Sequence, residues 1–125
     1  MCGHIILLNM MHMKSTNNSV PRHIGVILDG NRRFAKRLMM KPFKGHEFGA
    51  EKVKKLLEWC KEVGVNELTL YCFSVDNFNR QKEEFDYLMD LIRKEFEDLK
   101  TDKKIDDNRI RINFIGRLGM FPKDI

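Results

Sequence analysis

Short apolar runs alternate with longer amphipathic stretches along the chain of 125 residues. The runs are rich in β-branched and aromatic residues, and polar or glycine-containing turns follow them, a pattern typical of strands. Three strands are therefore predicted, at residues 22–28, 67–74 and 109–116.

Helices are predicted between these strands, because apolar residues recur there at steps of three and four, the spacing of one helical face. The first such stripe spans residues 46–63, and Gly64 follows it where a C-terminal cap belongs. A shorter helix is predicted over residues 32–39, ending before Pro42. The second long stripe consists of Phe85, Leu88, Met89, Ile92, Phe96 and Leu99.

The order strand, helix, strand, helix, strand predicts an α/β fold, a parallel sheet with flanking helices joined by right-handed crossovers. We assign residues 20–125 to one domain. Residues 1–19 have no sustained period and are interpreted as a loose N-terminal leader, in which translation could begin at a later methionine. Because three strands are few for such a sheet and Pro122 stands where a further helix could begin, we expect a C-terminally truncated chain.

Charge favours an anionic ligand without identifying it. The 23 Lys and Arg residues outnumber the 18 Asp and Glu residues, for a net charge of +5, which is mild for a nucleic-acid-binding protein. The three cysteines form no C-x-x-C pair, so we expect a reducing, cytoplasmic setting. No apolar run reaches the 18 residues of a membrane span, although contact with a membrane surface stays possible.

Two polar stretches follow the first and second predicted strands, "DGNRR" at 29–33 and "SVDNFNR" at 74–80. Ligands of open α/β sheets bind at the carboxyl ends of strands, so both stretches are expected to face one cleft. Gly30 permits a tight turn, and Arg33 with the following helix N-terminus offers positive charge to a diphosphate. Asp29 would repel a bare phosphate unless Mg²⁺ lies between them, so the combination favours a metal–diphosphate site.

Each of these features also has an ordinary interpretation. Asp-Gly after a strand is most often a turn, and a run of Lys and Arg is most often a solvated face. His46 could simply begin a helix, Asn77 could cap a turn and Phe78 could fill the core.

Several chemistries are disfavoured by the sequence. It contains no G-x-x-x-x-G-K-[ST] loop of a P-loop NTPase, no H-E-x-x-H zinc motif and no Cys/His cluster. The stretch "ILDGN" is weakly similar to the loop of an aspartyl-phosphate phosphatase, but Asn31 stands where that loop has its second acid.

Three linked motifs, "HIGVILDGNRRFAK", "GHEFGAEKV" and "ELTLYCFSVDNFNR" followed by "KEEFDYLMDLI", resemble the cis-prenyltransferase family, the undecaprenyl and dehydrodolichyl diphosphate synthases. Arg32 and "EWC" before "KEVGV" are closer to its archaeal and eukaryotic branch. The resemblance implies repeated condensation of isopentenyl diphosphate onto an allylic diphosphate with Mg²⁺, yielding a long polyprenyl diphosphate, and a homodimer at full length.

The resemblance also implies roles for individual residues. Asp29 matches the aspartate that binds Mg²⁺ and helps the allylic diphosphate depart, and His46 matches a histidine that contacts the phosphates. Asn77 matches an asparagine often assigned as proton acceptor; a neutral carboxamide is a poor base, so an orienting role is preferred. The remaining substrate-binding positions implied are Gly30, Asn31, Arg32, Arg33, Phe34, Ser74, Val75, Asp76, Phe78 and Arg80.

Two departures from the family pattern stand out. Pro42 occupies the place of a family arginine, for which Lys41 or Lys44 could substitute. The segments that would bind isopentenyl diphosphate, supply a second metal-binding glutamate and form much of the dimer interface are absent, so we expect these 125 residues to be inactive alone. Two alternatives are a non-catalytic accessory subunit, disfavoured by the intact Asp29, and a basic nucleic-acid-binding module, for which no motif is found.

Overall fold

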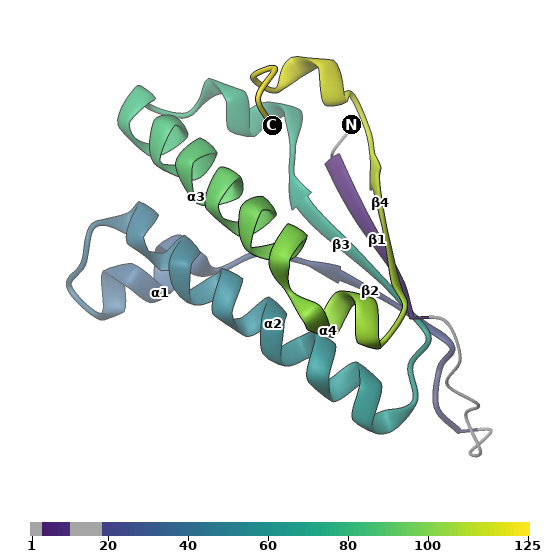
Figure 1. Cartoon of the computed structure of the whole chain (residues 1–125). Coiled ribbons are helices and arrows are strands. Elements are labelled where there is room, and N and C mark those ends of the chain that lie inside the picture. The colour runs from purple at the N-terminus through teal and green to yellow at the C-terminus, as the bar shows by residue number, and fades with distance from the viewer. Residues whose placement is uncertain (1–3, 11–18) are drawn as a thin grey trace.

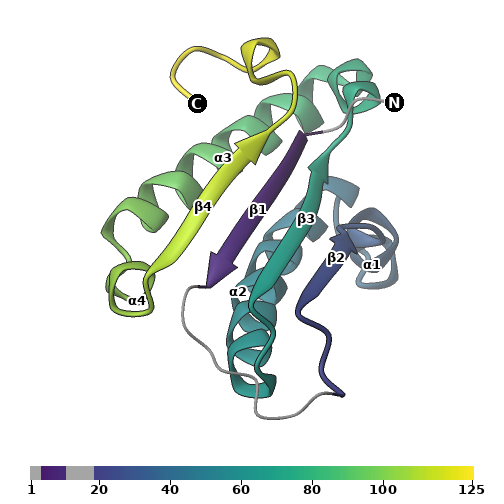
Figure 2. The ribbon, with the colours of Figure 1, turned by 90° about the vertical axis from the view of Figure 1, so that its right-hand side faces the viewer.

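Four strands form one mixed sheet, and the long helices lie against one of its faces (Figure 1 and Figure 2). The computed structural model describes residues 4–10 and 19–125. In spatial order the strands are β2 (His23–Ile27), β3 (Glu67–Phe73), β1 (His4–Met10) and β4 (Ile110–Ile115).

The predicted alternation of strands and helices is confirmed over the second to fourth strands. The helices are α1 (Asn31–Arg37), α2 (Gly45–Val63) and α3 (Lys82–Thr101), with 3₁₀ turns η1 (Pro42–Lys44), η2 (Val75–Asn79) and η3 (Leu118–Met120). Gly64 ends α2 in the left-handed conformation, at φ 88°, as its sequence position predicts. A short helix that the sequence did not indicate, α4 (Lys103–Asp107), lies in the charged connector.

The prediction that the first 19 residues form a loose leader is wrong for β1. This strand lies between β3 and β4 and pairs antiparallel with both, so the sheet is mixed rather than wholly parallel. Its backbone is hydrogen-bonded along both edges, and the Leu8 side chain is only 4% exposed. Pairing and burial therefore fix this strand, although its short apolar run shows no clear period in the sequence. Residues 11–18 of the predicted leader lie outside the described residues.

β2 and β3 run parallel, and their register pairs His23 with Glu67 and Ile27 with Tyr71. Both helical crossovers, β2 to β3 through α2 and β3 to β4 through α3, move in the same direction across the sheet. Right-handed crossovers in one direction place their helices on one face, which is the arrangement in Figure 2.

The core lies between this face and the helices, in two groups. One is built around Leu68, Leu70, Val65 and Cys60, and the other around Phe73, Leu88 and Met89. No helix among the described residues combines the length and the apolar character needed to cross a membrane.

Candidate active site

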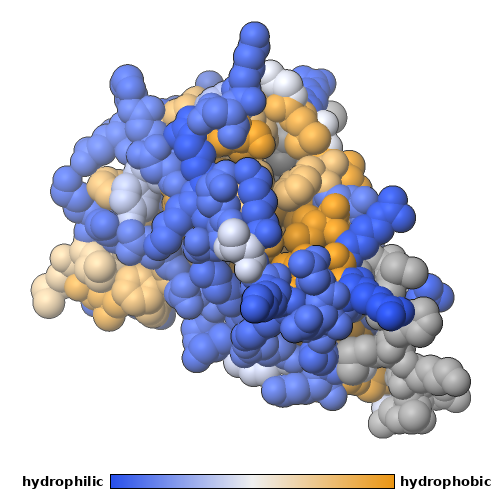
Figure 3. Space-filling model, viewed as in Figure 1, coloured by the Kyte–Doolittle hydropathy of each residue, from blue (hydrophilic) through white to orange (hydrophobic). Residues whose placement is uncertain are grey.

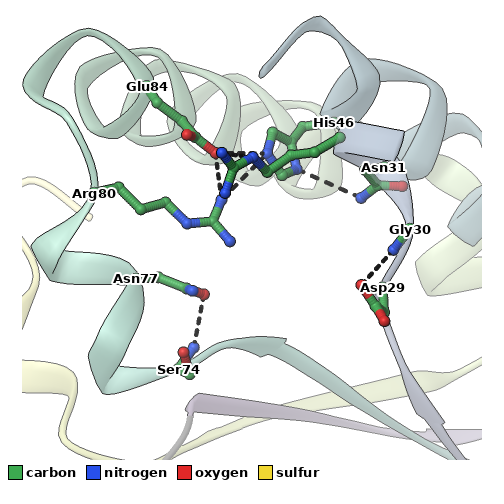
Figure 4. Close-up of polar contacts among 9 residues, drawn as sticks. Asp29, Gly30, Asn31, His46, Ser74, Asn77, Arg80 and Glu84 are labelled. Atoms are coloured by element: carbon green, nitrogen blue, oxygen red, sulfur yellow. Dashed lines mark hydrogen bonds and ion pairs between the residues drawn. The ribbon is translucent and has the colours of Figure 1, made fainter. Parts of the chain in front are cut away.

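The polar residues predicted from the sequence gather where β2 and β3 end. Because these strands are parallel, their carboxyl ends lie at the same edge of the sheet. Figure 4 shows Asp29 and Gly30 on one side of an open space, with Asn77 and Arg80 on the other side and His46 and Glu84 between the two sides. The predicted meeting of the two stretches is therefore confirmed.

The loop after β2 holds an exposed ion pair. Asp29 Oδ1 accepts a hydrogen bond of 2.6 Å from the backbone N–H of Gly30, and Asp29 Oδ2 accepts one of 3.0 Å from Arg33. Gly30 adopts φ 91°, a left-handed conformation that favours glycine. The Asp29 and Arg33 side chains are 76% and 74% exposed, so a charged ligand can reach both groups.

A buried carboxylate, Glu84, organises the opposite part of the site. Its side chain is 11% exposed, and Arg80 donates a 2.7 Å hydrogen bond to its Oε1. The same oxygen lies 3.4 Å from His46 Nε2 and 3.8 Å from Arg32 Nε. One acidic group of α3 therefore holds Arg32 of α1, His46 of α2 and Arg80, which follows η2, at the edge of the open space.

His46 is held between Asn31 and Glu84. Asn31 Nδ2 lies 3.4 Å from His46 Nδ1, while Glu84 Oε1 and Arg80 Nη1 lie 3.4 and 3.3 Å from His46 Nε2. Depending on the tautomer, Nε2 either donates to Glu84 or accepts from Arg80, because a guanidinium can only donate. Burial lowers the pKa of His46 below 6.5; the hydrogen bond to Glu84 acts in the opposite direction, and the charge of Arg80 lowers it further. The imidazole is therefore neutral at neutral pH.

Asn77 caps the η2 turn, as the ordinary interpretation of the sequence held. Its Oδ1 accepts a 2.9 Å hydrogen bond from the Ser74 backbone N–H, and the Ser74 side chain accepts in return from the Asn77 backbone. This capping box engages the carboxamide oxygen of Asn77 (Figure 4). The hydrogen bond fixes the orientation of the Asn77 carboxamide.

The other predicted positions divide between cleft and core. Phe78 packs against Phe73 and Phe121, with ring centroids 5.0 and 5.5 Å apart, so its ring fills the core. Phe34 is 44% exposed and contacts Phe48 edge to face. Val75 and Asp76 lie in η2, the turn that also holds Asn77 and Phe78; Val75 is partly buried and Asp76 is exposed.

The proposed substitutes for a family arginine are paired elsewhere. Lys41 contacts Glu83 at 2.9 Å, and Lys44 contacts Glu47 at 3.3 Å and Tyr87 Oη at 3.1 Å. Neither ammonium group is therefore available to the site without breaking these contacts.

Two glycines that sequence reasoning passed over allow α2 to approach α1. A Cβ on Gly45 would lie 1.9 Å from the Asn31 carbonyl oxygen, and one on Gly49 would lie 2.6 Å from Asn31 Nδ2. Their spacing of four residues puts both on one face of α2, a signal visible in "GHEFG". Glu84 was also missed, although it stands four residues after Arg80, the spacing of a helical ion pair.

An apolar cavity of about 440 Å³ lies between the sheet and α3. Burial raises the pKa of Cys72, in its wall, to about 11, which keeps the thiol neutral. Of the apolar stripe of α3, Ile92 lines this cavity, whereas Leu88 and Met89 are core residues. The lining also includes Ile6, Phe73, Phe96, Leu99, Ile112, Phe114, Leu118, Phe121 and Ile125.

The α/β sheet thus carries arginines, a histidine and two carboxylates at the carboxyl edge of β2 and β3, and an apolar cavity between the sheet and α3. The prenyltransferase family model described as undecaprenyl diphosphate synthase matches residues 27–125. The chain belongs to this family.

Curated relatives agree with this membership. The chain is 44% identical over 112 residues to the tritrans,polycis-undecaprenyl-diphosphate synthase (geranylgeranyl-diphosphate specific) of Pyrococcus horikoshii, covering 90% of this chain and 42% of the relative. It is 46% identical over 106 residues to the isoprenyl transferase of Thermus thermophilus, covering 85% of this chain and 40% of the relative. The chain thus spans about two fifths of the length of the relatives it matches.

Proposed function

We propose that the protein contributes the allylic-diphosphate site of a cis-prenyltransferase, which condenses isopentenyl diphosphate onto an allylic diphosphate to extend a polyprenyl chain. The observation that carries this proposal is the cleft itself. Asp29 with Arg33 faces Arg80 across an open space, next to a cavity whose lining is almost wholly apolar. A ligand with a diphosphate head and a hydrocarbon tail matches both parts.

The charged groups of the cleft suit a departing diphosphate. When an allylic diphosphate ionises, negative charge grows on the leaving oxygens, and preorganised cations stabilise that charge where it develops. Arg80 is held in place by Glu84, and Arg33 is held by Asp29. His46, neutral at neutral pH, lies among these groups without adding a fixed charge.

The residues of the cleft suit an Mg²⁺ ion that is held jointly by the protein and by the phosphates of the substrate. Among the described residues no group of three or more His, Cys, Asp or Glu side chains could hold a metal alone. Mg²⁺ usually takes one or two carboxylates plus substrate phosphates, and exposed Asp29 supplies one carboxylate beside the arginines. When bound, the ion would draw negative charge from the leaving diphosphate.

The apolar cavity suits the growing hydrocarbon. Phe73 lines the cavity and packs on Phe78, which follows Asn77 of the cleft, so the two regions adjoin. A chain that leaves the cleft in this direction would be removed from water by Ile92 and Phe96 of α3. Assembly as a homodimer is part of the proposal for the full-length protein.

Calorimetric titration with geranylgeranyl diphosphate tests the proposal. We expect binding that Mg²⁺ strengthens and a chelator weakens. In Asp29→Asn the ratio of the affinity with Mg²⁺ to the affinity without it should fall at least about tenfold, because one carboxylate ligand is lost. Adding isopentenyl diphosphate to the 125-residue chain should give no elongated product.

The matched control is Asp86→Asn, which removes a carboxylate paired with Lys82 on the exposed face of α3. Its affinity should equal that of the unaltered chain. Absence of binding, or Mg²⁺ dependence that survives intact in Asp29→Asn, would contradict the proposal.

A further inference from the structure

The turn that follows α1 presents three apolar side chains to solvent. Leu38, Met39 and Met40, here named the α1 tip, are 47%, 95% and 37% exposed. Figure 3 shows a pale orange surface at the lower left, where Figure 1 draws this turn as the outermost part of the molecule on that side. Three consecutive exposed apolar residues at a protruding turn are unusual for a surface that faces only water.

The backbone fixes this exposure. Met39 has φ 55°, a left-handed conformation that is uncommon for a residue with a long side chain and costs free energy. The conformation is held by hydrogen bonds of 3.0 Å from the Met39 N–H to the Lys36 carbonyl and from the Met40 N–H to the Ala35 carbonyl. The strained turn therefore directs Met39 outward rather than back onto the protein.

Positive charges flank the α1 tip. Lys36 and Arg37 occupy the last turn of α1 and are exposed, and Lys41 follows the tip. Among the described residues neither Lys36 nor Arg37 takes part in an ion pair. Apolar side chains next to two unpaired cations, Lys36 and Arg37, match the interface of an anionic bilayer, where apolar groups enter the acyl boundary and cations meet the head groups. Lys41, on the other side of the tip, pairs with Glu83.

Apolar surface continues from the tip along α1. Phe34 lies four residues before Leu38, on the same face of the helix, and its exposed ring contacts exposed Phe48 of α2. At 1.5 Å per residue, the seven residues of α1 place the tip about 10 Å from the helix start that carries Arg32 and Arg33. The surface is thus continuous with the neighbourhood of the candidate active site.

We propose that the α1 tip docks the protein onto membranes that contain anionic lipid, with Met39 inserted into the interface and Lys36 and Arg37 on the head groups. The docking is a property of this surface and does not depend on catalysis, so it can be measured without any prenyl diphosphate. It would hold the cleft beside a phase into which long hydrocarbon chains partition.

Cosedimentation with lipid vesicles tests this inference. The chain should bind vesicles of phosphatidylcholine with about 30% phosphatidylglycerol, and bind pure phosphatidylcholine vesicles much more weakly. Met39→Asp should reduce the partition coefficient about tenfold or more. Replacing both cations, in Lys36→Gln with Arg37→Gln, should remove most of the preference for anionic lipid. Aspartate adopts the left-handed conformation more readily than methionine, so Met39→Asp should fold normally, as circular dichroism can verify.

The matched control is Met120→Asp, which alters another exposed methionine, in η3 at the far end of the molecule (Figure 1). Its binding to vesicles should be unchanged. Equal losses in the two aspartate variants, or equal binding to neutral and anionic vesicles, would overturn the inference. So would sedimentation velocity showing self-association that only Met39→Asp abolishes, because the tip would then be a contact between two copies of the chain.

Discussion

At the scale of single residues, Glu84 decides how the cationic groups of the cleft are arranged. It is buried and contacts Arg80, His46 and Arg32 through one oxygen. The sequence presents it as one of two adjacent glutamates, three and four residues after Arg80, and both spacings allow a helical ion pair. Which of the two is buried depends on how α3 is rotated against α2, which only packing determines.

Glu84→Gln is therefore expected to lower the free energy of unfolding by about 1–3 kcal/mol, because it removes charge-assisted hydrogen bonds from Arg80 and His46 in a buried place. Urea denaturation measures the change. Glu83→Gln is the control. Glu83 is exposed and pairs with Lys41, so this substitution should change the free energy of unfolding by no more than about 0.5 kcal/mol. Equal losses at both positions would show that Glu84 is not the organising group.

His46 gives the stability of the protein a predictable dependence on pH. Its pKa in the folded state is lowered from 6.5, chiefly by burial, so the unfolded chain takes up a proton first as the pH falls. The free energy of unfolding should therefore decrease on acidification below pH 6.5, at a rate of at most about 1.4 kcal/mol per pH unit from this group.

The measurement is the difference in unfolding free energy between the unaltered chain and His46→Gln from pH 7.5 to pH 5. The difference should shrink or reverse toward low pH, because the variant lacks the titrating group. His23→Gln, at a half-exposed histidine of β2, controls for general effects of losing an imidazole. A pH-independent difference for His46→Gln would contradict the account.

At the scale of elements, α1 and α2 meet through glycine. The open sides of Gly45 and Gly49 let Asn31 lie directly against α2, and Asn31 in turn contacts His46. The cleft loop after β2 is thus positioned by helix packing as well as by its own turn.

Gly45→Ala should lower the free energy of unfolding by about 1–3 kcal/mol, because the added Cβ would lie 1.9 Å from a backbone oxygen that cannot move alone. It should also weaken diphosphate binding, since Asn31 and His46 must separate. Gly25→Ala is the control, because nothing lies within 4 Å of its Cβ. Thermal denaturation and calorimetric titration measure the two effects, and a stable Gly45→Ala with normal affinity would refute this packing argument.

Sequence patterns predicted α1, α2, α3 and the second to fourth strands because these elements carry a helical period or a buried apolar run, whereas α4 was missed. β1 was missed because "HIILLNM" is short, lacks alternation and is fixed by burial and by hydrogen bonds to β3 and β4, strands distant in sequence. The cleft could be predicted because the polar stretches follow parallel strands. The contacts of Glu84 and Gly45 could not, since they depend on side-chain packing between elements.

At the scale of the whole molecule, the sheet joins two environments of opposite character. The cationic cleft lies at the ends of β2 and β3, and the apolar cavity lies between the sheet and α3. The phenylalanines Phe73, Phe78 and Phe121 stand between them. The proposed ligand, charged at one end and apolar along its length, would contact both environments at once.

The most direct test of this account is NMR titration of the labelled chain with geranylgeranyl diphosphate and Mg²⁺, compared with inorganic diphosphate and Mg²⁺. Both ligands should shift the backbone signals of Gly30, Arg33 and Arg80. Only the prenyl compound should also shift the methyl signals of Ile92 and Ile112 in the cavity. Equal patterns for the two ligands, or prenyl shifts that avoid the cavity, would contradict the claim that cleft and cavity together form one prenyl diphosphate site.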